Sequence, residues 1–101
     1  MTFNQKIYGL LKKVPKGKVT TYKELAEAVG TRAYRAVGNA MNKNPHESHV
    51  VPCHRVVSAD GSLGGYAHGA EKKIWMLKQE GIKVKNGKIE NFKKILYTFR
   101  F

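Results

Sequence analysis

Acidic residues and cysteine are both scarce in this sequence of 101 residues. A single Cys excludes an internal disulfide framework and favours a reducing, intracellular setting, cytoplasmic if the source is prokaryotic. One Cys and four His without finger spacing give no structural zinc site, so we expect no metal. No apolar run approaches the roughly 20 residues of a membrane helix, and the N-terminus lacks the apolar core of a signal peptide. The length predicts one domain spanning residues 1–101.

The shortage of acidic residues leaves a net charge of +12. Nine basic and two acidic residues lie in 1–43, four of each sign in 44–81, and six basic and one acidic in 82–101. Basic arms of this kind bind phosphates in a sequence-independent, salt-sensitive way, whereas a solvated basic surface without a partner is the alternative. The net charge favours a nucleic-acid partner, and the neutral segment 44–81 between the basic arms is free to carry out a reaction.

Apolar side chains share one helical face from Phe3 to Val14, which predicts a first helix with Thr2 as its cap. Pro15 and Gly17 end that helix. An extended stretch over 19–21 is expected to follow.

A helix-turn-helix is predicted over about residues 21–43. Thr21 and Glu24 form a capping-box pattern, Gly30 stops that helix, and Thr31 caps a second helix that ends near Lys43. Small residues make the second helix slim: Ala33, Ala36, Gly38 and Ala40. They indicate either tight packing inside the domain or close approach by another body, and the spacing does not decide between them.

After the Asn44-Pro45 break, short extended pieces are expected at 50–51 and 56–57 on either side of a cysteine-bearing loop. A helix over 70–80 follows, with four side chains available for burial: Ile74, Trp75, Met76 and Leu77. Asn86-Gly87 predicts a hairpin within a C-terminal hairpin and tail, residues 82–101. The predicted fold is α+β and mostly helical.

Cys53 precedes His54 directly, an arrangement in which a base can deprotonate a nucleophilic thiol. The alternative is a small buried apolar cysteine, which is common. Its flanking residues belong to a longer pattern, which resembles the O6-alkylguanine-DNA alkyltransferases from about residue 3 to 81. The matching motifs are Val14-Pro15-x-Gly17-x-Val19-x-Thr21-Tyr22, Arg35-Ala36-Val37-Gly38-x-Ala40-Met41, Asn44-Pro45, Pro52-Cys53-His54-Arg55-Val56, Gly64-Gly65-Tyr66 and Glu80-Gly81.

The resemblance implies DNA repair by a single-turnover methyltransferase that needs no cofactor. Cys53 would accept the alkyl group from O6 of guanine, with His54 taking the thiol proton through a water and Glu80 orienting His54. Tyr22 would protonate the leaving guanine, and Asn44 would be the polar hinge residue. The resemblance implies that the guanine pocket is lined by Met41, Val56, Tyr66 and Ala67.

The resemblance also implies a monomer that binds double-stranded DNA containing O6-alkylguanine in the minor groove, with the target base flipped out. Arg35 would fill the gap in the base stack. The expected DNA contacts come from Tyr22, Ala33, Arg35, Ala36, Gly38, Ala40 and Arg55.

Larger relatives carry an additional N-terminal domain, and we expect the hairpin and tail after Gly81 to serve partly as a substitute cover. His68 either narrows the pocket against bulky alkyl groups or is a solvent-facing loop residue.

Two other functions remain as alternatives. One is an alkyltransferase-like protein that flips alkylguanine without transfer and flags damage; the other is a helix-turn-helix regulator of the major groove, which the slim helix disfavours.

Overall fold

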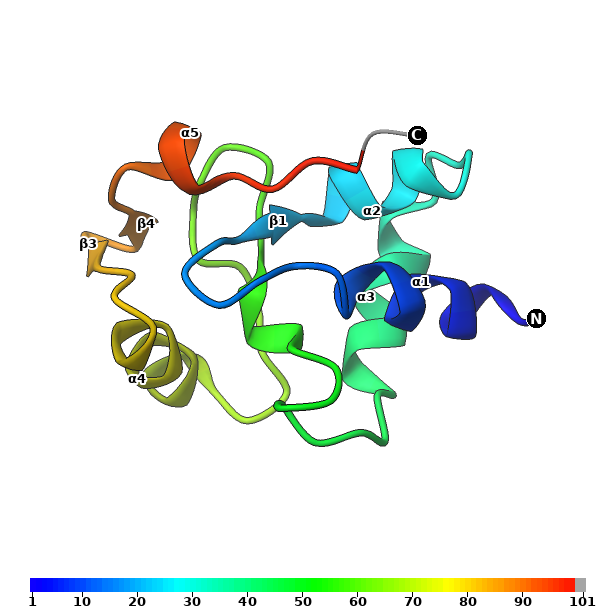
Figure 1. Cartoon of the computed structure of the whole chain (residues 1–101), viewed down its shortest axis with the longest axis horizontal. Coiled ribbons are helices and arrows are strands. Elements are labelled where there is room, and N and C mark those ends of the chain that lie inside the picture. Colours follow the sequence, from blue (N-terminus) through cyan, green and yellow to red (C-terminus); the bar gives the residue numbers. More distant parts are fainter. Residues whose placement is uncertain (100–101) are drawn as a thin grey trace.

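Two clusters of buried apolar side chains organise the chain, and a computed structural model describes residues 1–99 (Figure 1). The first cluster lies among three helices: α1 (Phe3–Leu11), α2 (Tyr22–Ala28) and α3 (Tyr34–Asn42). Thr2 caps α1 in a full capping box with Gln5. The Tyr8 hydroxyl donates to the carbonyl of Ala40 at 2.7 Å, which joins α1 to α3 inside the core.

A short parallel sheet positions the cysteine segment. Strand β1 (Thr20–Thr21) pairs in parallel with β2 (Val56–Val57), so that Thr20 lies opposite Val56. The 3-10 helix η1 (Cys53–Arg55) ends where β2 begins. The pairing therefore holds the cysteine-bearing turn next to the start of α2.

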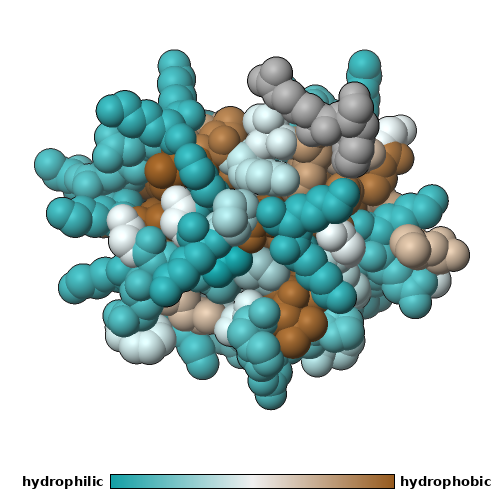
Figure 2. Space-filling model, viewed as in Figure 1, coloured by the Kyte–Doolittle hydropathy of each residue, from teal (hydrophilic) through white to brown (hydrophobic). Residues whose placement is uncertain are grey.

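The C-terminal third forms the second cluster. It contains α4 (Ala70–Gln79), the antiparallel hairpin of β3 (Val84–Lys85) and β4 (Lys88–Ile89), and α5 (Phe92–Ile95). The buried side chains of this cluster are Val19, Val57, Leu63, Leu77, Ile82 and Ile89. Figure 2 shows hydrophilic side chains over this end of the molecule, where the exposed lysines of residues 82–94 lie.

The chain after α5 returns along β1 (Figure 1). Leu96 forms a parallel bridge with Val19, and the Tyr97 N–H donates to the Val19 carbonyl at 2.6 Å. The Thr20 hydroxyl donates to the carbonyl of Tyr97, whose ring packs on the first cluster together with Phe99. The tail therefore joins the two halves of the core.

The predicted fold class is confirmed: helices predominate, and the sheets are small. Both predicted helices of the helix-turn-helix are present as α2 and α3, and the Asn86-Gly87 hairpin forms with both residues at positive φ. Within residues 1–99, no helix is long and apolar enough to cross a membrane.

Three local predictions are wrong. Thr31 does not cap α3: its hydroxyl accepts the Ala33 N–H, and the helix starts only at Tyr34. Residues 50–51 are not extended, because both N–H groups donate back to the Glu47 carbonyl in a turn. In α4, Ile74 and Trp75 are 36% and 60% exposed, and Lys73 is buried on the inner face instead.

Ending the chain at Gly81 should lower the melting temperature by more than about 10 °C. The truncation removes Ile82 and Ile89 from the second cluster, and burying one such side chain is worth about 1.5–3 kcal/mol. Circular dichroism melting measures the change. A double variant, Lys93→Ala with Lys94→Ala, removes two exposed charges but no buried side chain, so it should melt close to the parent. An unchanged melting temperature after truncation would show that the hairpin and tail do not stabilise the core.

Candidate active site

Cys53 lies half-buried at the start of η1 and is held by the side chain of Asn44. The Asn44 Nδ2 donates to the Cys53 Sγ at 2.7 Å and to the Val51 carbonyl at 3.3 Å, while its Oδ1 accepts the His46 N–H. Burial raises the pKa of the Cys53 thiol, and the Asn44 hydrogen bond offsets only part of that. The thiol is therefore protonated at neutral pH, and a base is needed to make it nucleophilic.

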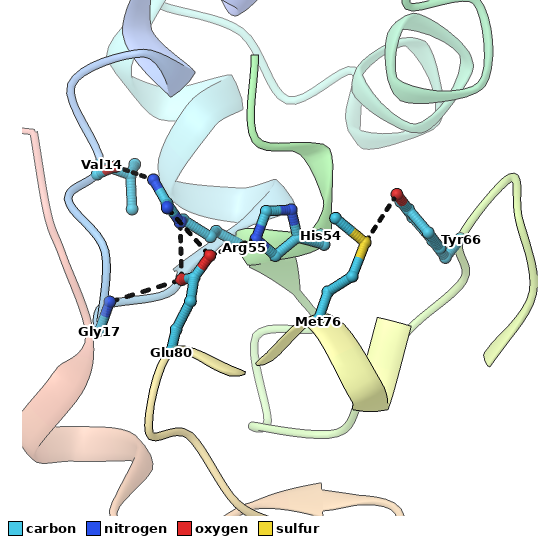
Figure 3. Close-up of polar contacts among 7 residues, drawn as sticks. All are labelled: Val14, Gly17, His54, Arg55, Tyr66, Met76 and Glu80. Atoms are coloured by element: carbon cyan, nitrogen blue, oxygen red, sulfur yellow. Dashed lines mark hydrogen bonds and ion pairs between the residues drawn. The ribbon is translucent and has the colours of Figure 1, made fainter. Parts of the chain in front are cut away.

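His54 follows Cys53 directly in the chain, and its side chain is buried. Its ring is 3% exposed, and its Nε2 lies 2.6 Å from the Glu80 Oε2 (Figure 3). Burial lowers the pKa of His54, although the Glu80 carboxylate partly opposes this. Because an ionised carboxylate only accepts hydrogen bonds, Nε2 carries the proton, and Nδ1 is the buried acceptor that has no partner within residues 1–99. A neutral imidazole with a free Nδ1 can take a proton.

Glu80 receives hydrogen bonds from three residues, two in η1 and one after α1 (Figure 3). The Arg55 guanidinium donates to both carboxylate oxygens at 2.8 and 2.9 Å, and the Gly17 N–H donates at 3.4 Å. Burial alone would raise the pKa of Glu80, but the hydrogen bonds and charges of Arg55 and His54 outweigh it and lower the pKa. Glu80 therefore stays ionised and fixes the His54 tautomer.

Arg55 has an internal role. Besides its bidentate pair with Glu80, its Nη1 donates to the Val14 carbonyl at 2.8 Å, and its side chain is only 16% exposed. Its expected contact with DNA stays a prediction.

A cavity of about 220 Å³ opens beside Cys53, lined by Tyr22, Gly38, Met41, Asn42, Gly65, Tyr66 and Ala67. The Tyr22 hydroxyl donates to the Gly65 carbonyl at 3.2 Å, and burial raises its pKa, so it remains protonated. Gly64 has φ +73°, and a Cβ there would lie 3.3 Å from the Tyr22 ring, so glycine lets the loop close over the tyrosine. Of the four residues that the resemblance assigns to the guanine pocket, Met41, Tyr66 and Ala67 line this cavity, and their contact with guanine stays a prediction. Val56 is fully buried, and its carbonyl binds Lys73.

Lys73 is the residue of the site that the sequence analysis missed. It is fully buried, and its Nζ donates to the carbonyls of Val56, Leu63 and Gly65 at 2.6, 2.5 and 3.1 Å. Burial lowers its pKa to about 8. The Gly65 carbonyl thus accepts hydrogen bonds from both Lys73 and Tyr22. Lys73 therefore holds in place the loop that lines one side of the cavity. Its spacing of four from buried Leu77, on the same helix face, was the available signal.

The small residues of α3 have two explanations, one for each face of the helix. Ala40 is buried and packs in the core. A Cβ at Gly38 would meet no atom within 4 Å, so internal packing does not explain that glycine, which lines the cavity. Ala33 and Arg35 are exposed and Ala36 is half-buried, so this part of the helix is open to a partner. No cluster of three or more metal-ligating side chains occurs within residues 1–99.

Comparison with known proteins gives a consistent set of similarities. The family profile of the 6-O-methylguanine DNA methyltransferase DNA-binding domain matches residues 2–82. A methylated-DNA–protein-cysteine methyltransferase of Metallosphaera sedula is 49% identical over 84 residues, which are 83% of this chain and 52% of the relative. The chain spans about half the length, or less, of the curated relatives it matches first.

Solved structures similar to this chain include complexes with DNA. Mycobacterium tuberculosis OGT in complex with DNA has a TM-score of 0.75 and 39% identity, covering 80% of this chain and 49% of that one. Schizosaccharomyces pombe (S. pombe) Atl1 in complex with damaged DNA containing O6-carboxymethylguanine has a TM-score of 0.80 and 30% identity. That match covers 96% of this chain and 95% of the other.

Replacing Lys73 by Met should lower the free energy of unfolding by about 2–4 kcal/mol, because three buried carbonyls lose their donor. Lys78→Met, on the exposed side of the same helix, should change it by less than about 0.5 kcal/mol. Urea unfolding measures both variants. Equal effects would show that the buried ammonium contributes nothing specific.

Proposed function

The chain belongs to the family of the 6-O-methylguanine DNA methyltransferase DNA-binding domain, and on that premise we propose that it repairs DNA by moving an alkyl group from O6 of guanine to Cys53. In this reaction the Cys53 Sγ attacks the alkyl carbon, the S–C bond forms, and the C–O6 bond breaks. The thiol proton passes through a water to the His54 Nδ1. The departing guanine takes a proton from the Tyr22 hydroxyl. The thioether persists, so each molecule reacts once.

The observation that carries this proposal is a protonated thiol on the wall of a cavity, followed directly in the chain by a buried, neutral histidine. Cys53 lines the 220 Å³ cavity together with Tyr22, whose hydroxyl remains a donor. His54 is held at Glu80, and its other ring nitrogen has no partner among residues 1–99. A nucleophile, a base with an orienting carboxylate and a donor for the leaving group are thus all present in the same few residues.

Binding of duplex DNA is proposed for the exposed part of α3. The net charge of +12 favours phosphate contacts, and Arg35 is exposed on this helix. We assign Arg35 to the gap that a flipped guanine leaves, and Asn44 to the hinge, where it already contacts Sγ. The DNA-bound structures of two relatives support this assignment.

Recognition of alkylguanine without transfer is the second candidate. Its support is the match with S. pombe Atl1, which covers nearly the whole of both chains, whereas the chain covers about half of the methyltransferases. The accessible Cys53 on the cavity wall favours transfer.

Intact-mass measurement after incubation with duplex DNA carrying O6-methylguanine distinguishes the two candidates. Transfer adds one CH2 unit to the wild-type chain, and peptide mapping places it on Cys53. The Cys53→Ser variant serves as the matched control and should gain no mass while still binding the DNA. Tight binding by the wild type without any mass gain would overturn transfer and support recognition alone.

A further inference from the structure

A further concave surface lies between α4 and the hairpin of β3 and β4, apart from the cavity beside Cys53. It measures about 670 Å³, and its lining shares no residue with that cavity. The lining comes from the second half of α4 and from residues 81–85 and 90. Figure 1 places α4 and the hairpin at the end of the molecule away from α1. We call this surface the hairpin groove; a molecule bound there leaves the Cys53 cavity open.

Three branched apolar side chains line the hairpin groove. Ile82 is buried and Val84 is half-buried, both against the second cluster, and Ile74 of α4 is exposed. Figure 2 shows apolar areas framed by hydrophilic side chains at this end of the molecule. Apolar side chains gathered in a concave surface favour a ligand that removes them from water. The groove is therefore suited to apolar side chains of a partner.

Positive charge is in excess in the same lining. Lys78, Lys83 and Lys85 are exposed there, and none of them forms an ion pair within residues 1–99. Glu90 is the one carboxylate among the described lining residues. Ammonium groups donate charge-assisted hydrogen bonds to carboxylates and phosphates. The charge therefore favours an anionic partner.

The outer edge of β3 carries backbone groups that face away from the hairpin. The Ile89 N–H donates to the Gly61 carbonyl and the Glu90 N–H donates to the Lys83 carbonyl, both at 2.9 Å. Because hydrogen-bonded and non-hydrogen-bonded pairs alternate along an antiparallel ladder, Val84 and Ile89 form a non-hydrogen-bonded pair. The Val84 N–H and C=O therefore point away from β4, toward a position that no strand of residues 1–99 occupies. Such an edge can pair with an added extended segment.

Duplex DNA would account for only part of these features. Its phosphates would pair with the lysines, but its backbone offers no apolar side chain to Ile74 and no strand to Val84. A polypeptide strand offers all three. Side chains alternate between the two faces of a strand, so Lys83 and Lys85 lie on the face opposite to Val84. An added strand with acidic and apolar residues in alternation matches both faces.

From the apolar lining, the lysines and the open strand edge together, we propose that the hairpin groove binds an extended, acidic segment of another protein. The segment pairs with the edge of β3 at Val84 and places apolar side chains against Ile74 and Ile82. Its carboxylates lie beside Lys83 and Lys85. This inference does not depend on alkyl transfer, because none of these residues lines the cavity beside Cys53.

A peptide of about seven residues in which Glu and Val alternate is the probe, since it has the length of an ordinary strand. Heteronuclear NMR of the isotope-labelled full chain should show saturable shifts that are confined to α4 and the hairpin and include the Val84 amide. The same peptide with Ser in place of Val keeps the charge and should bind about fivefold more weakly or worse. Equal binding of the two peptides, or shifts spread over lysines throughout the chain, would overturn the inference.

Charge reversal in the groove tests the lysines. Lys83→Glu with Lys85→Glu should raise the dissociation constant of the Glu-Val peptide about tenfold or more, because attractions become repulsions. Lys93→Glu with Lys94→Glu makes the same change in net charge at exposed lysines outside the lining, and should alter the constant by less than about twofold.

Equal weakening by the two double variants would reduce the interaction to net charge and overturn the inference. Undamaged duplex DNA that shifts the same amides and displaces the peptide would also overturn it, and would assign the groove to DNA instead. Displacement of the peptide by neither DNA nor salt-matched buffer, with the groove variants weakened as expected, supports the acidic segment.

Discussion

The buried carboxylate of Glu80 is the group on which the geometry of the site depends. It lies at the end of α4 and accepts hydrogen bonds from His54 and Arg55 of η1 and from Gly17 after α1. Arg55 neutralises it, so the carboxylate stays ionised despite its burial. An ionised Glu80 holds the Nε2 proton of His54 and leaves Nδ1 as the acceptor on the other side of the ring. The same carboxylate therefore joins η1 to the segment after α1 and sets the tautomer of His54.

Local backbone signals were sufficient for much of the fold. Thr2, Gly30 and the pair Asn86-Gly87 were recognised from the sequence, because caps, stops and tight turns depend on a few adjacent residues. Predictions that depend on distant partners failed. The valines at 50–51 have high strand propensity, yet no strand in the described part of the chain pairs with them, and their N–H groups turn back to Glu47. Lys73 is buried only because carbonyls from β2 and from the loop of residues 63–65 converge on its ammonium.

In the candidate site, too, local sequence signals and contacts between distant residues must be told apart. Cys53, His54 and Glu80 came from a resemblance to a family, since 26 residues separate His54 from Glu80 and only the fold brings them to 2.6 Å. Nothing in the sequence indicated the second, larger cavity of about 480 Å³ that Cys53 also lines, because its lining comes from α3, the loop of residues 44–49, the loop after Tyr66, and α4. The charge distribution was informative in outline. The neutral middle of the chain holds the thiol and its base, and the basic ends supply α3 and the lysine-rich C-terminal surface (Figure 2).

The Glu80→Gln variant tests the central claim most directly, through the single-turnover rate of alkyl transfer alongside the His54 titration followed by NMR. Gln keeps the shape but loses the charge that raises the pKa of His54, so the His54 pKa should fall further below its ordinary value. The transfer rate should drop by about 100-fold or more, because the tautomer and the orientation of the base are no longer fixed. DNA binding should change little. A folded Glu80→Gln protein that transfers at the wild-type rate would contradict the account.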